Sequence, residues 1–278
     1  MGGNREYRSD VFSLLFREKR RALELYNALN GSHYDDPGQV ETVELGNGGI
    51  SLSVRSDASF ILGASLNIYE HQSTVCPNMP LRCLVYFTTI IHRRYWDKNI
   101  FGRTLLKIPA PHFVVFYNGT EDAPEQCRLR LSEAFENGVE EPELELTCHV
   151  YNINEGRNPE LLTRSPTLRD YMYLMDLVRE FDVKTGHADL AGAIELALKK
   201  CIRENVLKDF LQEHYTEVVK MMQWDFTFEH RLELEREEGR EEDIRNMLAR
   251  DKTPEQIADF CGYDLELVKR VQSGMADV

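Results

Sequence analysis

The pattern of hydrophobic residues changes along this 278-residue chain, from short β-type segments to helical spacing alone. Between residues 50 and 153 apolar residues form short runs or alternate with polar ones, as at residues 50–54, which is typical of strands. From about Thr167 they recur at helical spacing. We therefore expect an α/β core at residues 9–160, followed by an all-helical extension at residues 161–278.

The α/β part should hold helices at its start and middle, with strands between them. Asp10 or Ser9 is a plausible N-cap for the first helical segment, and Asn30-Gly31 is a stop signal. Pro80 suits the first turn of a second helix. The expected elements are one or two helices at 10–29, strands at 50–54, 58–62, 66–72, 113–117 and 144–153, and helices at 80–96, 167–182, 188–203, 207–223 and 226–249.

The charge of the chain is distributed unevenly. Residues 1–135 contain 15 Lys and Arg and 15 Asp and Glu, whereas residues 136–278 contain 18 and 32, so all of the net charge of −14 lies in the second half. Because phosphate neutralisation needs a basic surface, nucleic acid should not bind over the whole molecule. If DNA is a partner, we expect the neutral half to contact it.

The composition also indicates the compartment. The six cysteines include no C-x-x-C pair, so neither a disulfide framework nor a zinc site is indicated. No apolar run approaches the ~20 residues of a membrane-spanning helix, and the first residues lack an apolar stretch of signal-peptide length. We expect a soluble, cytoplasmic protein that does not bind membranes.

Two carboxylates are predicted to meet on a hairpin. Segments 58–62 and 66–72 flank a turn at residues 63–65, and their pairing would bring Asp57 opposite Glu70. Gln72 shares a face with Glu70, whereas His71 points away. Carboxylate oxygens of this kind suit Mg²⁺. Solvated side chains at the ends of the strands are the alternative.

Several linked motifs around this hairpin resemble the PD-(D/E)XK nuclease family transposases, also called Rpn family recombination-promoting nucleases. The central motifs are Asp-x-x-Phe at 57–60, Tyr-Glu-His-Gln-Ser-Thr at 69–74 and Asn-x-x-Leu-Arg at 78–82. The flanking motifs are Asp-Val-Phe-x-x-Leu-Phe at 10–16, Leu-Tyr-Asn-Ala-Leu-Asn-Gly at 25–31, Phe-Tyr-Asn-Gly at 116–119 and, more loosely, Arg-Glu-Glu-Gly-Arg at 236–240.

This resemblance implies a restriction-endonuclease-like core, a mixed sheet flanked by helices, that cuts DNA with Mg²⁺ or Mn²⁺. Carried over by position, Asp57 and Glu70 would ligate the metal together with the backbone carbonyl of His71. Gln72 stands where the family pattern usually has Lys. Since Gln provides neither a positive charge nor a base, it could only hold and orient the attacking water.

Four further residues are candidates for supporting roles. Arg82 and Tyr86 lie four positions apart on one helix face and are predicted to contact DNA, with an ion pair to a nearby carboxylate as the alternative for Arg82. Related nucleases have Gln where Arg82 stands. Asp10 and Glu24 could be accessory acidic ligands, or alternatively a helix cap and a solvated residue.

The end of the chain favours two short helices at residues 253–272, beginning with the Thr253 N-cap, Pro254 and Gln256. This pair could be a DNA-reading helix-turn-helix, but residues 251–272 carry more acidic than basic side chains, which favours packing or homo-oligomer formation through the helical C-terminal region. A metal-dependent endonuclease is the primary hypothesis. The alternatives are a catalytically silent module that binds DNA or protein, and a helical scaffold.

Overall fold

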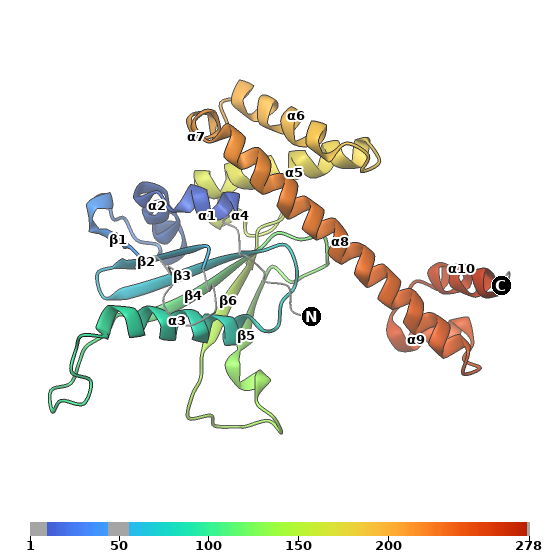
Figure 1. Cartoon of the computed structure of the whole chain (residues 1–278), viewed down its shortest axis with the longest axis horizontal. Helices are drawn as coiled ribbons and strands as arrows, with labels where there is room; N and C mark the ends of the chain where they lie inside the picture. The colour runs from blue at the N-terminus through green and yellow to red at the C-terminus, as the bar shows by residue number, and fades with distance from the viewer. Residues whose placement is uncertain (1–9, 44–55, 277–278) are drawn as a thin grey trace. The chain divides into compact units, whose positions relative to one another are not determined.

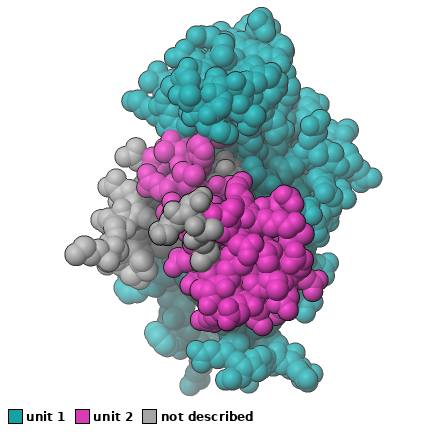
Figure 2. Space-filling view, turned by 90° about the vertical axis from the view of Figure 1, so that its right-hand side faces the viewer, with its two compact units in different colours: residues 1–223 teal, residues 224–278 magenta. Residues whose placement is uncertain are grey.

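The computed structural model describes residues 10–43 and 56–276 (Figure 1). The chain divides into two compact units, Met1–Gln223 and Trp224–Val278, which Figure 2 colours separately. The strand predicted at residues 50–54 lies outside the described residues. Within the parts that are described, no helix is both long and apolar enough to cross a membrane.

The first unit contains a mixed sheet of six strands among its described residues. The order is β1-β2-β3-β4-β6-β5, in which β3, β4 and β6 are parallel and the other neighbours antiparallel. The expected α/β fold with flanking helices and a helical C-terminal region is thereby confirmed. The strands are β1 Val40–Thr42, β2 Ala58–Leu62, β3 Ser65–Gln72, β4 Ala110–Tyr117, β5 Gln126–Arg130 and β6 Thr147–Asn152.

Helices cover both faces of this sheet (Figure 1). On one face α3 packs on a core that includes Ile68, Val115 and Cys148. On the other face, Phe12 of α1 lies against Phe116 and against Tyr171 of α5. The helices of this unit are α1 Val11–Phe16, α2 Lys19–Asn30, α3 Met79–Tyr95, α4 Pro159–Arg164, α5 Pro166–Lys184, α6 Leu190–Arg203, α7 Lys208–Glu213 and the start of α8 Tyr215–Leu248, with short 3₁₀ helices η1 Pro37–Gln39 and η2 Leu131–Ala134.

Local signals set the bounds of the first elements. The Asp10 side chain accepts a hydrogen bond from the Ser13 N–H and caps α1, as predicted. Gly31 ends α2 with φ of 64°, a left-handed conformation that glycine adopts without strain. In the predicted β2–β3 hairpin, which is confirmed, Gly63 has φ of 58° and Leu62 pairs with Ser65.

The prediction of two helices at 207–223 and 226–249 is wrong about where one helix ends and the next begins. The chain breaks at His214, which caps the short helix α7, and α8 then runs without interruption through residues 223–226. Residues 223–226 are Gln-Trp-Asp-Phe, with neither proline nor glycine to end a helix.

The second unit holds the end of α8 with α9 Pro254–Cys261 and α10 Leu265–Ala276. The predicted pair of short helices is confirmed, including the Thr253–Gln256 capping box and a left-handed Gly262 between them. Ile244, Ile257 and Val268 form a small core among the three helices. Homo-oligomer formation through this region stays a prediction.

Candidate active site

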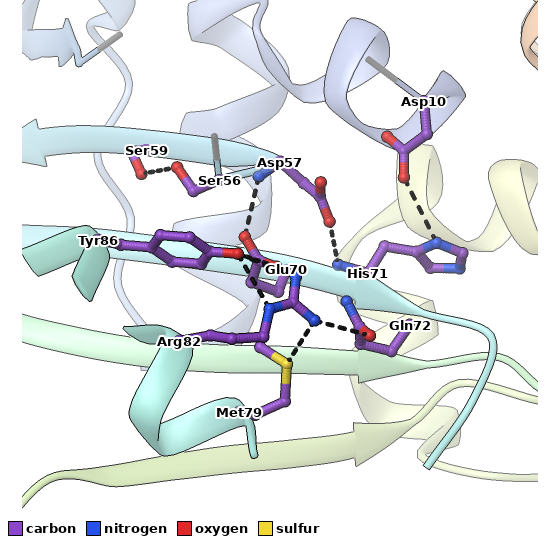
Figure 3. A network of polar contacts seen from close by, with 10 residues as sticks. All are labelled: Asp10, Ser56, Asp57, Ser59, Glu70, His71, Gln72, Met79, Arg82 and Tyr86. Atoms are coloured by element: carbon purple, nitrogen blue, oxygen red, sulfur yellow. Dashed lines mark hydrogen bonds and ion pairs between the residues drawn. The ribbon is translucent and has the colours of Figure 1, made fainter. Parts of the chain in front are cut away.

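The hairpin brings Asp57 and Glu70 together, as the sequence predicts (Figure 3). Ala58 pairs with Tyr69, and one residue further the Asp57 N–H donates to Glu70 Oε1 at 3.1 Å. In return, the His71 N–H donates to Asp57 Oδ2 at 2.7 Å. The Ser13 hydroxyl of α1 donates to the Asp57 carbonyl at 2.6 Å. Two strands and one helix therefore fix the position of Asp57.

Both carboxylates are buried, and burial dominates their electrostatics. The side chain of Glu70 is inaccessible to solvent and Asp57 is 6% exposed. Burial raises the pKa of Glu70 to about 8, although the charge of Arg82 works in the opposite direction. Burial and the charge of Glu70 raise the pKa of Asp57 well above its ordinary value. Near neutral pH the pair therefore favours taking up a proton or a cation.

Arg82 supplies one positive charge to this site. Its guanidinium lies 2.9 Å from Glu70 Oε2 and donates to Gln72 Oε1 at 3.2 Å. The Tyr86 hydroxyl accepts hydrogen bonds from Arg82 and donates to Glu70 Oε2 at 3.4 Å. Of the two roles weighed for Arg82, the structure thus shows the ion pair with a carboxylate, while DNA binding by Arg82 and Tyr86 stays a prediction.

Gln72 and His71 lie on opposite faces of β3. Gln72 is on the same face as Glu70 and borders a mainly apolar cavity of about 120 Å³. The His71 imidazole stacks on Phe12 and lies 3.7 Å from Asp10 Oδ2, measured from Nδ1. It therefore takes part in packing, and only its backbone faces the carboxylate pair. Ligation by its carbonyl stays a prediction.

The two accessory acidic residues have structural roles in different places. Asp10 caps α1, and its negative charge helps to raise the pKa of both Asp57 and Glu70. Glu24 of α2 accepts hydrogen bonds from Ser165 and Thr167 at the start of α5. It is therefore partly buried and joins two helices, which differs from the solvated side chain expected as its alternative.

The chemistry of the pair fits a divalent cation. Asp57 and Glu70 offer hard oxygen donors, and when both are ionised they carry, with Asp10 nearby, more negative charge than the Arg82 guanidinium balances. No group of three or more His, Cys, Asp or Glu side chains among the described residues could hold a metal by itself. An ion at this position would therefore need backbone or water oxygens in addition to the two carboxylates, which is usual for Mg²⁺.

Two members of the network carry no sequence signal for their roles. Ser13 supports the Asp57 backbone from α1, and Met79 Sδ lies 3.2 Å from the Arg82 guanidinium. Neither residue type is specific for a polar site. Their positions follow from how α1 and α3 pack on the sheet, which the local sequence does not reveal.

Comparison with known proteins found no relative of this chain. No protein-family model, curated protein or solved structure matches the chain. The functional argument therefore rests on the motifs of the sequence and on the geometry of the site.

Proposed function

We propose that this protein is a Mg²⁺- or Mn²⁺-dependent DNA endonuclease related to the PD-(D/E)XK nuclease family transposases. The observation that carries the proposal is the buried Asp57–Glu70 pair, which is held by hydrogen bonds between the starts and ends of two adjacent strands. Gln72 lies two residues after Glu70, on the same face of β3. The raised pKa values of both carboxyls support it, because groups of perturbed pKa gather at functional sites.

Asp57 and Glu70 would hold the ion through their carboxylate oxygens. Bound Mg²⁺ would neutralise charge on the scissile phosphate and acidify a water molecule. Gln72 can accept a hydrogen bond from that water, but its Oε1 already receives one from Arg82. The Arg82 guanidinium, which pairs with Glu70 in this structure, would be less strongly attracted to Glu70 if that carboxylate held a cation, and it would then be available to a DNA phosphate.

A catalytically silent DNA- or protein-binding module is the second candidate, and one observation favours it. Arg82 pairs with Glu70 and also occupies the acceptor oxygen of Gln72. A side chain that satisfies both residues can replace a metal ion in stabilising the fold. The module would keep the hairpin geometry without hydrolysing DNA.

Nicking of supercoiled plasmid in the presence of Mg²⁺ or Mn²⁺ tests the proposal. We expect cutting that is lost in Asp57→Asn and in Glu70→Gln, but not in the control Asp122→Asn, whose side chain is 99% exposed. Circular dichroism of each variant checks that it is folded. If all three variants cut as well as the parent, a contaminating nuclease explains the activity and the proposal is wrong.

Substitutions of Gln72 separate the two candidates further. Gln72→Glu keeps an acceptor oxygen and should retain partial activity, whereas Gln72→Leu removes it at similar volume and should be nearly inactive. If no metal supports cutting by the parent protein while it still binds the same plasmid, the silent module becomes the better description.

A further inference from the structure

The segment that joins α3 to β4, residues 96–109, projects away from the sheet beyond the end of α3 (Figure 1). This α3–β4 loop exposes large apolar side chains: Phe101 is 93% exposed and Trp96 and Leu105 are each 75% exposed, and Ile100 and Ile108 are exposed as well. A single exposed apolar residue is common on proteins, but five within 13 residues form a surface that usually marks a binding site.

The same surface is basic in an acidic protein. Residues 96–109 contain three Lys and Arg and one Asp, and Arg93 and Arg94 of α3 precede them, although the whole chain has a net charge of −14. Arg94 is bound to Glu41 of β1, and Lys98 lies 3.4 Å from Asp97. Arg103 and Lys107 make no ion pair within the described residues. The side chains of Arg103 and Lys107 are exposed and therefore available to an anionic partner.

We infer that the α3–β4 loop is a nucleic-acid-binding surface, in which cations neutralise phosphates and exposed aromatic side chains stack on bases or wedge between them. Proteins bind single strands and the minor groove of duplexes with this combination of basic and aromatic side chains. The choice of DNA as the polymer rests on the proposed function. The loop also lies in the half of the chain that carries no net negative charge.

Helix α3 connects the loop to the candidate active site within the first unit. Arg82, near the start of α3, contacts Glu70, and Trp96 follows its last residue. These two positions are about 20 Å apart along a helix with a rise of 1.5 Å per residue. That length matches about six base pairs of DNA at 3.4 Å each. One duplex could therefore contact both ends of α3.

Binding of the full-length protein to a fluorescein-labelled 20-base-pair duplex in EDTA tests the inference without any cleavage step. Phe101→Ser should weaken binding by about 5- to 150-fold, the scale of one aromatic contact with a base, because it removes the ring that would wedge between two base pairs of the duplex. Leu196→Ser is the control, since Leu196 is a large apolar residue that is 54% exposed on α6, and it should leave the affinity unchanged. Both replaced side chains are exposed, so neither variant should lose its fold.

The charge of the loop is tested by the salt dependence of the same binding. Replacing both Arg103 and Lys107 with Ser should lower the slope of log affinity against log salt by about 2, because each phosphate contact contributes about 0.9. A matched double variant, Lys184→Ser with Lys199→Ser, changes the net charge equally at exposed positions of α5 and α6. It should leave the slope nearly unchanged.

Tryptophan fluorescence reports direct contact. The chain contains two tryptophans, Trp96 and Trp224, so a Trp224→Phe variant leaves Trp96 as the single emitter. Duplex DNA should quench this emission and protect it from acrylamide. Unchanged affinity in the Phe101 and Arg103/Lys107 variants, with Trp96 equally accessible to acrylamide, would overturn the inference.

Two further outcomes separate this inference from its rivals. If Phe101→Ser turns a dimer into a monomer in sedimentation velocity while its DNA affinity stays that of the parent, the loop binds a second copy of the chain and the inference fails. If the loop variants weaken DNA binding but the parent never cuts DNA, the loop inference stands and the endonuclease proposal fails. If the parent and all loop variants cut DNA equally and bind it with the same affinity, the endonuclease proposal stands and the loop inference fails.

Discussion

Charged and aromatic side chains are buried or bound to one another at the start of helix α3 but exposed to solvent at its end. At its start, the Arg82 guanidinium and Tyr86 hydroxyl bind the inaccessible carboxylate of Glu70. At its end, the α3–β4 loop holds Trp96, Phe101 and several cations in solvent. The polar groups of the first region bind one another, whereas the large apolar side chains of the second are mostly exposed to solvent, with the Trp96 ring also lying 4.5 Å from that of His92.

The two regions differ in how far their ligand-binding geometry is formed before a ligand binds. A buried network sets geometry in advance, but its members must exchange partners when an ion or water enters. An exposed loop has little preformed geometry and gains its contacts only on binding. Mutations at the start of α3 should therefore change stability and its pH dependence, and mutations at its end should change binding alone.

Arg82→Ala should produce the largest difference between the two ends. At a pH above the Glu70 pKa of about 8, the Glu70 carboxylate would then be buried without its cation, which costs about 3–5 kcal/mol for a fully buried pair. Because the Arg82 side chain is 29% exposed, we expect a loss of about 2–4 kcal/mol in the free energy of unfolding. The matched variant Arg103→Ala should change it by less than about 0.5 kcal/mol. Urea denaturation followed by circular dichroism measures both.

Addition of Mg²⁺ or Mn²⁺ sharpens this test. A divalent cation at Asp57 and Glu70 would supply the charge that Arg82→Ala removes, so it should restore more stability to that variant than to the parent. Equal stability of Arg82→Ala and Arg103→Ala would contradict the expectation and would mean that protonation of Glu70 fully replaces the guanidinium.

Much of this site could be predicted from the sequence because its determinants are local. Alternation along residues 66–72 places Glu70 and Gln72 on one face, and the Gly63-Ala64 turn sets the register that brings Asp57 to Glu70. The Asp10 cap and the Thr253 capping box likewise depend on neighbours a few residues apart. Such short-range rules do not need knowledge of the tertiary fold.

Other elements cannot be predicted from the local sequence, because they depend on contacts between segments that are distant along the chain. The edge strand β5 has only every second residue partly buried, so its apolar signal is weak. Helix α4 follows its N-cap Asn158, whose left-handed backbone is held by hydrogen bonds from its side chain to the carbonyls of Glu125 and Asn152. Tertiary packing also determines which group Arg82 contacts. The sequence alone therefore allows both alternatives, a DNA phosphate and an ion pair with a nearby carboxylate.

The pH dependence of stability should show an effect of intermediate size. The pKa of Glu70 is about 8 in the folded protein, above its ordinary value of 4.5, so between about pH 5 and pH 8 the folded state binds more protons than the unfolded state. The free energy of unfolding should therefore fall as the pH rises through this window, by at most about 1.4 kcal/mol per pH unit for one proton. The raised pKa of Asp57 acts in the same direction.

Glu70→Gln removes one of these titrating groups and should flatten the dependence, whereas the exposed Glu133→Gln should leave it as in the parent. Thermal unfolding at one-unit steps from pH 5 to pH 8 measures this. An equally steep fall in Glu70→Gln and the parent would show that another group is responsible and would remove Glu70 as the proton-binding member of the pair.

The smallest effect is expected at the other end of α3. Phe101→Ser replaces a side chain that is already in water, so the free energy of unfolding should change by less than about 0.5 kcal/mol. Phe113→Ala, in the neighbouring strand β4, is the positive control: Phe113 is 5% exposed and packs in the core under α3, so about 3–5 kcal/mol should be lost. Loss of more than about 1 kcal/mol in Phe101→Ser would mean that the loop packs on the protein in solution. The contrast between the two ends of α3 would then fail, because the side chain assigned to DNA would already have a partner within the chain.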